Sequence, residues 1–256
     1  MRRLVEIYLK NTPAVPDVTK GSRIAAVDLA RTAAIVGMVI FHIARDLEFF
    51  GQLPPGTTLA GGWALLARTV AGSFLFLTGF SLVLAHGGFV RWRPFLRRLV
   101  TVGLAALAIS VVTRLALPDR FIYFGILHAI FFCSIIGICF VWVQASWSAL
   151  GALIVWCIWA VFARSLDLPI WMAWTGLRQS VPPSLDFIPV FPWLAPCLLG
   201  IAMAKVTSTY WKGQHSTGPV LDILTWPGRH SLSIYLLHQP IILGALWVVI
   251  RFYGAG

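Results

Sequence analysis

Residues 23–50 read RIAAVDLARTAAIVGMVIFHIARDLEFF, and this stretch decides the class of fold. Its apolar part, Ile24–Ile43, has the length that an α-helix needs to cross a hydrocarbon layer about 30 Å thick. Three ionisable side chains lie inside it, namely Asp28, Arg31 and His42. Each costs about 2.5 kcal/mol or more at the centre of a membrane helix unless it is paired or faces a polar cavity. The stretch therefore predicts a membrane helix with paired or functional groups.

Apolar runs of similar length recur along the rest of the chain. With the first, they cover Ile24–Ile43, Trp63–Ala85, Leu96–Leu117, Phe121–Val143, Trp147–Leu166, Phe187–Ala204 and Leu232–Ile250. A helix satisfies its own backbone hydrogen bonds in lipid, and the alternating pattern of a membrane barrel is absent. The composition is 59% hydrophobic and 11% charged, which excludes an ordinary soluble globule. The sequence predicts an all-α, polytopic membrane bundle of about seven transmembrane helices.

The distribution of charge predicts the orientation of this bundle. Lys and Arg concentrate in residues 1–23, after the second apolar run and before the last one, which places the N-terminus in the cytoplasm. We expect a basic cytoplasmic leader, residues 1–23, and one transmembrane domain, residues 24–256. The leader is either a short interfacial helix or a disordered tail, and it lacks the pattern of a cleavable signal peptide. The net charge of +11 then indicates topology and contact with anionic lipid rather than nucleic acid.

Two further features concern packing. The connection from about Ser165 to Asp186 is rich in Trp, Pro and Leu, so we expect it to lie along the interface as a cap over the bundle. All four cysteines fall in apolar runs without metal-ligand spacing, and we expect neither a metal site nor a structural disulfide.

The ionisable groups of the first helix share one face. Asp28 and Arg31, three residues apart, are spaced for an ion pair, which could be their whole role. Eleven residues at about 100° each return His42 to within roughly 20° of Arg31. Asp46 follows four residues later, where a carboxylate could orient the imidazole as a general base. The alternative is a capped histidine at the end of the helix.

Other polar groups recur at membrane depth or next to it. His128, His238 and Gln239 suggest a lined cavity, although a lone buried histidine is more often a packed group. Two basic segments, residues 86–98 and 228–231 (GRHS), are either topogenic charge or a site for the phosphates of a nucleotide-bearing cosubstrate. Motifs for nucleotide hydrolysis, hydride transfer and zinc hydrolysis are absent.

The chain resembles the heparan-α-glucosaminide N-acetyltransferase catalytic-domain family, within a wider membrane acyltransferase superfamily that includes acyltransferase family 3. The resemblance begins with RIAAVDLAR followed by His42 and Asp46 in the first helix. It continues through residues 72–79 (GSFLFLTG), 124–128 (FGILH), 191–193 (FPW) with Gly200, and 228–240 (GRHSLSIYLLHQP). These motifs extend from the first predicted helix to the last.

The resemblance implies transfer of an acyl group, typically acetyl, from acyl-coenzyme A in the cytoplasm to a sugar on the far side of the membrane. It implies that His42 is catalytic and that acetyl-CoA is the cosubstrate. The residues themselves suggest Asp46 as the partner of His42, and no metal is expected. The expected substrate-binding residues are Asp28, Arg31, Arg68, His128, Trp193, Arg229, His230, His238 and Gln239. Human-type enzymes have more helices and a large lumenal segment, so the acceptor here is left open as a glycan or a small hydroxyl or amine. The expected location is a bacterial inner membrane.

Two other functions remain compatible with the residues. Intramembrane Asp, Arg and His side chains also form the proton relays of transporters and flippases, although the sequence shows no repeat and no pair of interrupted helices. An accessory subunit, whose polar groups only hold helices together, is the third interpretation.

Overall fold

The computed structural model describes residues 24–211 and 218–253, so the predicted leader lies outside the described part. Within these ranges the chain forms nine α-helices and no β-strand, which confirms the all-α prediction there. The helices are α2 (Ala25–Phe49), α3 (Gly61–His86), α4 (Trp92–Ala116), α5 (Ile126–Phe140), α6 (Ala145–Phe162), α7 (Val190–Val206), α8 (Ser208–Trp211), α9 (Pro219–Arg229) and α10 (Ser231–Tyr253).

Five helices, α2, α3, α4, α6 and α10, are long and apolar enough to cross a membrane. The chain is therefore an integral, multi-pass membrane protein. The other two predicted spans form α5 and α7, which are apolar but shorter. Their predicted starts were wrong, because the helices begin at Ile126 and Val190 and not at Phe121 and Phe187.

The residues before α5 and α7 are extended and run beside one another. The backbone N–H of Ile188 donates to the carbonyl oxygen of Phe124 at 3.0 Å. The carboxylate of Asp186 accepts the N–H of Ile126, the first residue of α5, at 2.9 Å. This carboxylate satisfies an N–H group that a helix start leaves free, so the bond holds the beginning of α5 in place.

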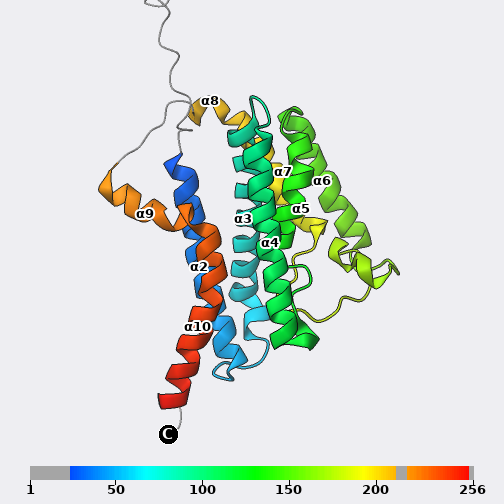
Figure 1. The fold of residues 1–256 in the computed structure, drawn as a ribbon. Helices are drawn as coiled ribbons and strands as arrows, with labels where there is room; N and C mark the ends of the chain where they lie inside the picture. Colours follow the sequence, from blue (N-terminus) through cyan, green and yellow to red (C-terminus); the bar gives the residue numbers. More distant parts are fainter. Residues whose placement is uncertain (1–23, 212–217, 254–256) are drawn as a thin grey trace, which may run out of the picture.

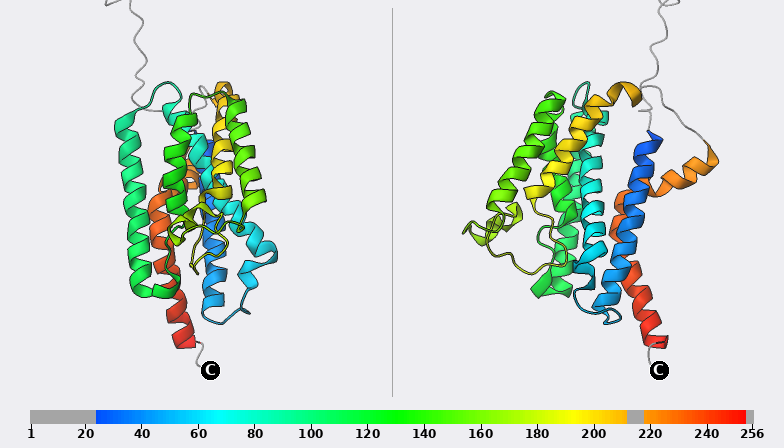
Figure 2. Two further views of the ribbon diagram at one scale, coloured as in Figure 1. Left: turned by 90° about the vertical axis from the view of Figure 1, so that its right-hand side faces the viewer. Right: turned by 180° about the vertical axis from the view of Figure 1, so that it is seen from behind.

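The long helices lie side by side, whereas α5, α6 and α7 extend along only part of the bundle (Figures 1 and 2). The beginning of α2 and the turn between α3 and α4 lie at one end of the bundle, whereas α10 ends at the other (Figure 1). The connection from α6 to α7 lies beneath the ends of α5, α6 and α7 (Figure 1). Trp174 in this connection stacks on Phe132 of α5, with ring centroids 5.5 Å apart, so the connection packs against the bundle.

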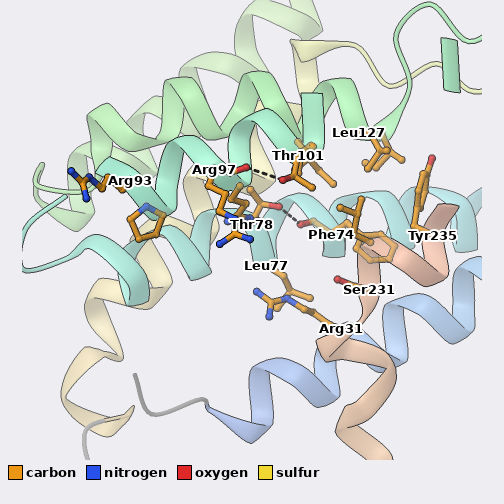
Figure 3. A pocket seen from close by; sticks show the side chains of 16 residues that line it. Arg31, Phe74, Leu77, Thr78, Arg93, Arg97, Thr101, Leu127, Ser231 and Tyr235 are labelled. Atoms are coloured by element: carbon orange, nitrogen blue, oxygen red, sulfur yellow. Dashed lines mark hydrogen bonds between the residues drawn. The ribbon is translucent and has the colours of Figure 1, made fainter. Parts of the chain in front are cut away.

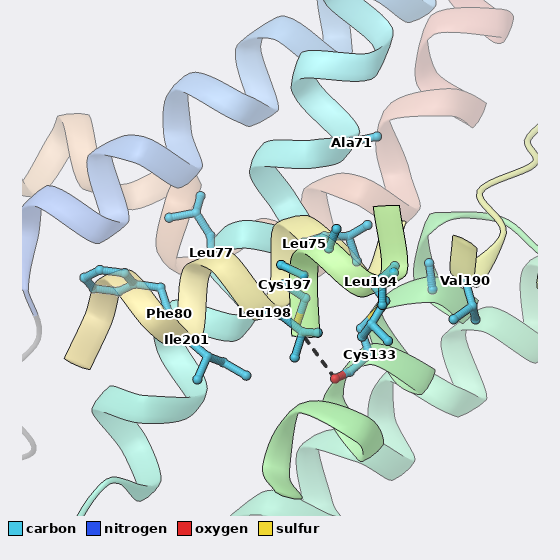
Figure 4. Packing of buried hydrophobic residues seen from close by; sticks show 14 of the residues in the cluster. Ala71, Leu75, Leu77, Phe80, Cys133, Val190, Leu194, Cys197, Leu198 and Ile201 are labelled. Atoms are coloured by element: carbon cyan, nitrogen blue, oxygen red, sulfur yellow. Dashed lines mark hydrogen bonds between the residues drawn. The ribbon is translucent and has the colours of Figure 1, made fainter. Parts of the chain in front are cut away.

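The main core lies where α3 crosses α7 and α5 (Figure 4). Leu75, Cys197 and Ile201 are fully buried there. A Cβ atom at Gly79 would lie 1.9 Å from the carbonyl oxygen of Cys197, and one at Gly200 would lie 2.0 Å from that of Phe76. Glycines in membrane helices permit such close contact of backbones. The GSFLFLTG motif and Gly200 thus serve this crossing, and all four cysteines are free.

Helix α9 was not predicted, because its eleven residues contain no apolar run long enough to signal a span. It begins at Pro219, a residue suited to the first helical position. It projects from the side of the bundle and then leads into α10 (Figures 1 and 2). Thr225 and Gly228 are buried, whereas Ile223 is 73% exposed. One face of α9 therefore packs on the bundle. The opposite face is exposed and also carries apolar residues.

Candidate active site

A cavity of about 590 Å³ lies between α2, α3, α4, α5 and α10 (Figure 3). Arginines line the part near the turn between α3 and α4: Arg93, Arg97 and Arg98 come from α4, and Arg31 comes from α2. Apolar side chains, including Leu77 and Ile130, line the body of the cavity. The cavity thus joins a cationic region to an apolar interior.

The spacing of residues along α4 accounts for the cationic lining. Arg93, Arg97 and Thr101 recur every four residues, which places them on one side of the helix. Arg98 lies beside this row and also lines the cavity. The sequence left the segment 86–98 open as topogenic charge or as a phosphate site, and the structure shows which arginines of that segment line the cavity.

Asp28 connects the cavity wall to the turn before α10. Its Oδ1 atom lies 3.1 Å from Nη1 of Arg31, which confirms the predicted ion pair. Its Oδ2 atom lies 3.8 Å from Nε of Arg229, whose Nη2 atom donates to Asp222 at 2.8 Å. Arg31 also donates to the hydroxyl of Ser81 on α3. The buried carboxylate of Asp28 is therefore shared between a cavity arginine and the GRHS motif.

Gly228 of that motif allows α9 to approach α2 closely. A Cβ atom at this position would lie 2.0 Å from the carbonyl oxygen of Asp28, which no side chain could tolerate without movement of the backbone. The N–H of Gly228 donates to the hydroxyl of Thr32 at 3.0 Å. Ser231, three residues later, lines the cavity. Part of the motif therefore packs α9 on α2, and part of it forms the cavity wall.

A second polar cluster lies between α2 and α10, deeper in the bundle. The rings of His42 and His238 meet edge to face, with centroids 4.7 Å apart. Nε2 of Gln239 donates to Oδ1 of Asp46 at 2.8 Å. The prediction that Asp46 orients His42 is thus not what the structure shows. The packing of α10 on α2 brings an amide donor to this carboxylate, and His42 meets a second imidazole instead.

Four buried polar atoms of this cluster have no hydrogen-bond partner among the described residues. They are Nδ1 of His42, Oδ2 of Asp46, Nε2 of His238 and Oε1 of Gln239. A buried polar atom without a partner costs about 1 to 3 kcal/mol, so such groups are rare in proteins and call for a physical explanation. Water or a bound ligand with several donor groups would satisfy them. We call these four residues the imidazole cluster.

Tyr235 joins the cavity to the imidazole cluster. It lines the cavity from α10 (Figure 3). Its ring centroid lies 5.5 Å from that of His238, one helical turn further along α10. A ligand that fills the cavity as far as Tyr235 would therefore end beside the two histidines. The sequence indicated Tyr235 only by its place within the 228–240 motif.

Asp186 is a carboxyl group near this end of the cavity that sequence reasoning did not single out. It bonds the backbone of Ile126, which is itself a lining residue. Burial raises its pKa from 3.8 to about 6, although the hydrogen bond from Ile126 acts in the opposite direction. No motif indicated it, because its position depends on how the long connection folds back on α5.

The other predicted site residues lie away from the imidazole cluster. Nδ1 of His128 accepts the N–H of Gly125 at 3.2 Å, and Nε2 lies 3.2 Å from the hydroxyl of Ser110, so both ring nitrogens have protein partners. His230 is exposed at the end of α9, against Trp226. Arg68 is exposed on α3. Trp193 packs on the main core near Gly72. Their roles in binding remain predictions.

Comparison with known proteins adds one finding. Residues 23–240 match the family described as heparan-alpha-glucosaminide N-acetyltransferase, catalytic. No curated protein and no solved structure gives a significant match to the chain. The matched range contains the arginine-lined part of the cavity, Tyr235 and all four members of the imidazole cluster.

Proposed function

Since this chain belongs to the heparan-alpha-glucosaminide N-acetyltransferase catalytic family, we propose that it transfers an acetyl group from acetyl-CoA to an acceptor across the membrane. Membership of this family implies a membrane N-acetyltransferase-like activity. One observation supports the proposal above the others: the arginine-lined cavity ends at Tyr235, beside His238 and His42. Tyr235 thus links the arginine-lined cavity to the histidine pair, because it lines the cavity and also contacts His238.

The donor would bind with its phosphates at the arginines of α4. Guanidinium groups form paired, charge-assisted hydrogen bonds with phosphate oxygens, and Arg93, Arg97 and Arg98 lie together on this wall. The pantetheine arm is flexible and less polar, which suits the apolar body of the cavity. The thioester at its end would then lie near Tyr235, next to the imidazole cluster.

The acceptor would bind at the imidazole cluster. Asp46 Oδ2 and Gln239 Oε1 are hydrogen-bond acceptors without donors, and each histidine has one further nitrogen without a partner. An amine or a hydroxyl on a sugar supplies the missing donors. Asp46 adds a negative charge that favours a cationic amine over a neutral hydroxyl. The preferred acceptor is accordingly a sugar or small molecule with a primary amine.

The donor and acceptor would arrive from opposite sides. The arginines of α4 lie at the end of the bundle where α2 begins (Figure 1), and the excess of positive charge assigns that end to the cytoplasm. We infer seven crossings, in which the extended residues before α5 and α7 complete the two shorter passages. An inner membrane of a bacterial cell, with envelope glycans outside, is the setting that fits this orientation.

The test is transfer of labelled acetyl from acetyl-CoA to glucosamine by the full chain in lipid vesicles. We expect His42→Ala to lower the rate by about 100-fold or more, because loss of acid–base or nucleophilic help costs at least that much. Binding of acetyl-CoA, measured separately, should be unchanged, since His42 is not among the residues that line the cavity.

The matched control is Ile43→Ala, which changes the next residue on α2 and leaves the histidine in place. Ile43 is 39% exposed and is not a member of the imidazole cluster. Equal transfer by His42→Ala and the parent chain would refute the proposal. Proton-coupled uptake of the amine without any need for acetyl-CoA would favour a transporter instead.

A further inference from the structure

The hydrogen bond of His238 determines which of its nitrogens carries a proton. Nδ1 of His238 lies 2.6 Å from the carbonyl oxygen of Tyr235, one turn earlier on α10. A carbonyl oxygen only accepts hydrogen bonds, so Nδ1 must be the donor and must carry the proton. In the neutral ring Nε2 then has a free lone pair. The backbone of α10 thereby holds His238 in the tautomer that presents a basic nitrogen.

This basic nitrogen, Nε2 of His238, is one of the buried atoms of the imidazole cluster that have no partner among the described residues. The side chain of His42 lies against the same ring. Tyr235, which lines the cavity, has its ring centroid 5.5 Å from that of His238. Nε2 therefore lies close to the place where the thioester and the acceptor would meet.

His42 has no equivalent support within the described residues. Its Nδ1 atom is buried without a partner, and the carboxylate that was expected to orient it is bonded to Gln239. A general base needs a second group that holds its tautomer and orientation. Of the two histidines, only His238 has such a group at Nδ1 in the described structure.

We infer that His238 is a second catalytic residue and that its Nε2 atom is the base that takes the proton of the acceptor; this inference rests on the proposed function. The acceptor nitrogen forms a bond to the acetyl carbon while the bond from that carbon to sulfur breaks. An acceptor that binds as an ammonium first loses one proton to water, which leaves a neutral amine with a free lone pair. As this amine attacks, its second proton passes to Nε2 and then to the sulfur of the leaving coenzyme A. The products are an N-acetylated acceptor and free coenzyme A thiol, so atoms and charges balance.

Asp46 would assist this step through its charge. The transfer places a positive charge on His238 for a time, and the carboxylate of Asp46 lies in the same cluster, held by Gln239, the residue after His238. Opposite charges attract strongly where water is scarce. His42 then remains available to contact the acceptor or the acetyl group, which leaves it essential for transfer without being the base.

The test uses His238→Asn and His238→Gln in the full chain in lipid vesicles. The amide of Asn occupies the place of Nδ1 and keeps the donor to Tyr235, but it has no atom at the position of Nε2. We expect His238→Asn to lower kcat for transfer to glucosamine by about 100-fold or more. The KM and the dissociation constant for acetyl-CoA should stay within about twofold, since the donor-binding arginines are untouched.

A second readout separates a base from a merely structural residue. Hydroxylamine is neutral and strongly nucleophilic at pH 7, so it depends less on a base than glucosamine does. His238→Asn should therefore retain a larger fraction of the parent rate with hydroxylamine than with glucosamine. His238→Gln, whose amide lies near the place of Nε2 but cannot accept a proton, should be as slow as His238→Asn with glucosamine.

The outcomes distinguish this inference from the proposed function. Active parent protein together with a fully active His238→Asn variant would overturn the inference and leave the proposed function intact. If both variants lost acetyl-CoA binding as well as transfer, the inference would also be overturned, because His238 would then have a structural role. A parent protein that transfers acetyl to no amine or hydroxyl would overturn both.

Discussion

Asp186 shows how a single carboxyl group depends on its surroundings in this bundle. It caps the beginning of α5 through Ile126, and burial raises its pKa from 3.8 to about 6. A carboxyl group with a raised pKa stabilises the folded state at low pH, where it is protonated in both states. This contribution is lost as the pH rises from the pKa of the unfolded state towards the pKa of the folded state, because the folded protein must then bury a charge.

We therefore expect the stability of the parent chain to fall between pH 4 and pH 7 relative to Asp186→Asn. The amide still accepts the N–H of Ile126 but carries no charge, so the variant lacks this pH-dependent loss. A shift of about two pKa units corresponds to about 2 to 3 kcal/mol. The measurement is the thermal unfolding midpoint in detergent at a series of pH values.

Asp119→Asn is the control for this experiment, because Asp119 is exposed and also lies between predicted spans. It should leave the pH dependence of the parent chain unchanged. Parallel pH curves for the parent and Asp186→Asn would show that burial of Asp186 has no energetic consequence.

At the scale of the helices, the crossing of α3 and α7 depends on two glycines. Gly79 and Gly200 leave no space for even a methyl group, since its carbon would lie about 2 Å from a carbonyl oxygen of the other helix. In lipid the apolar effect does not drive helices together, so close packing of this kind supplies much of their association. Larger residues would force the two backbones apart.

We expect Gly79→Ala to destabilise the protein by about 1 to 3 kcal/mol or more, as overpacking of a tight interface does. Gly62→Ala is the matched control on the same helix, because a Cβ atom there meets nothing within 4 Å. Thermal unfolding of both purified variants in the same detergent gives the comparison. Equal midpoints for Gly79→Ala and Gly62→Ala would show that the close contact is unimportant.

Lys205 at the end of α7 adds a second contact between elements. Its ammonium group donates to the carbonyl oxygens of Phe140 and Val143, at the end of α5 and in the turn before α6. A cation is favourable at the C-terminal end of a helix, where carbonyl groups lack partners. The sequence indicated Lys205 only as topogenic charge, whereas the structure shows that it also joins three helices.

At the scale of the whole molecule, charge and fold predict the same orientation. The arginines of α4 and the beginning of α2 share one end, and α10 finishes at the other (Figure 1). In the proposed topology of seven crossings, the turn between α3 and α4 would face the cytoplasm and the loop between α2 and α3 would face outside. The arginine-lined cavity would then open towards the cytoplasm, where acetyl-CoA is made.

Labelling of single introduced cysteines with a membrane-impermeant maleimide tests this orientation. Gln52→Cys, in the exposed loop after α2, should react in intact cells, and Gly88→Cys, in the exposed turn after α3, should react only in opened membranes. The parent chain, with its four native cysteines, gives the background. The reverse pattern of labelling would invert the proposed topology and place the arginine cavity outside.

Much of the architecture could be predicted from the sequence, because apolar length is a local property. Each predicted apolar run became a helix, although several boundaries differ by a few residues, as where α2 continues to Phe49. Helices α5 and α7 begin later than predicted, because the backbone before each of them is extended, with Asp186 bonded to the first residue of α5. The ion pair of Asp28 with Arg31 was also predictable, since both residues lie one turn apart on the same helix. Family membership followed from motifs in chain order.

The partners of the candidate site depended on tertiary structure. Helical periodicity placed Asp46 and His42 on one face, but only the packing of α10 on α2 could bring Gln239 to Asp46 and His238 to His42. The cavity likewise needs five helices to form its walls. Spacing along one helix predicts neighbours on that helix alone, whereas contacts between helices nearly two hundred residues apart are decided by how their surfaces pack.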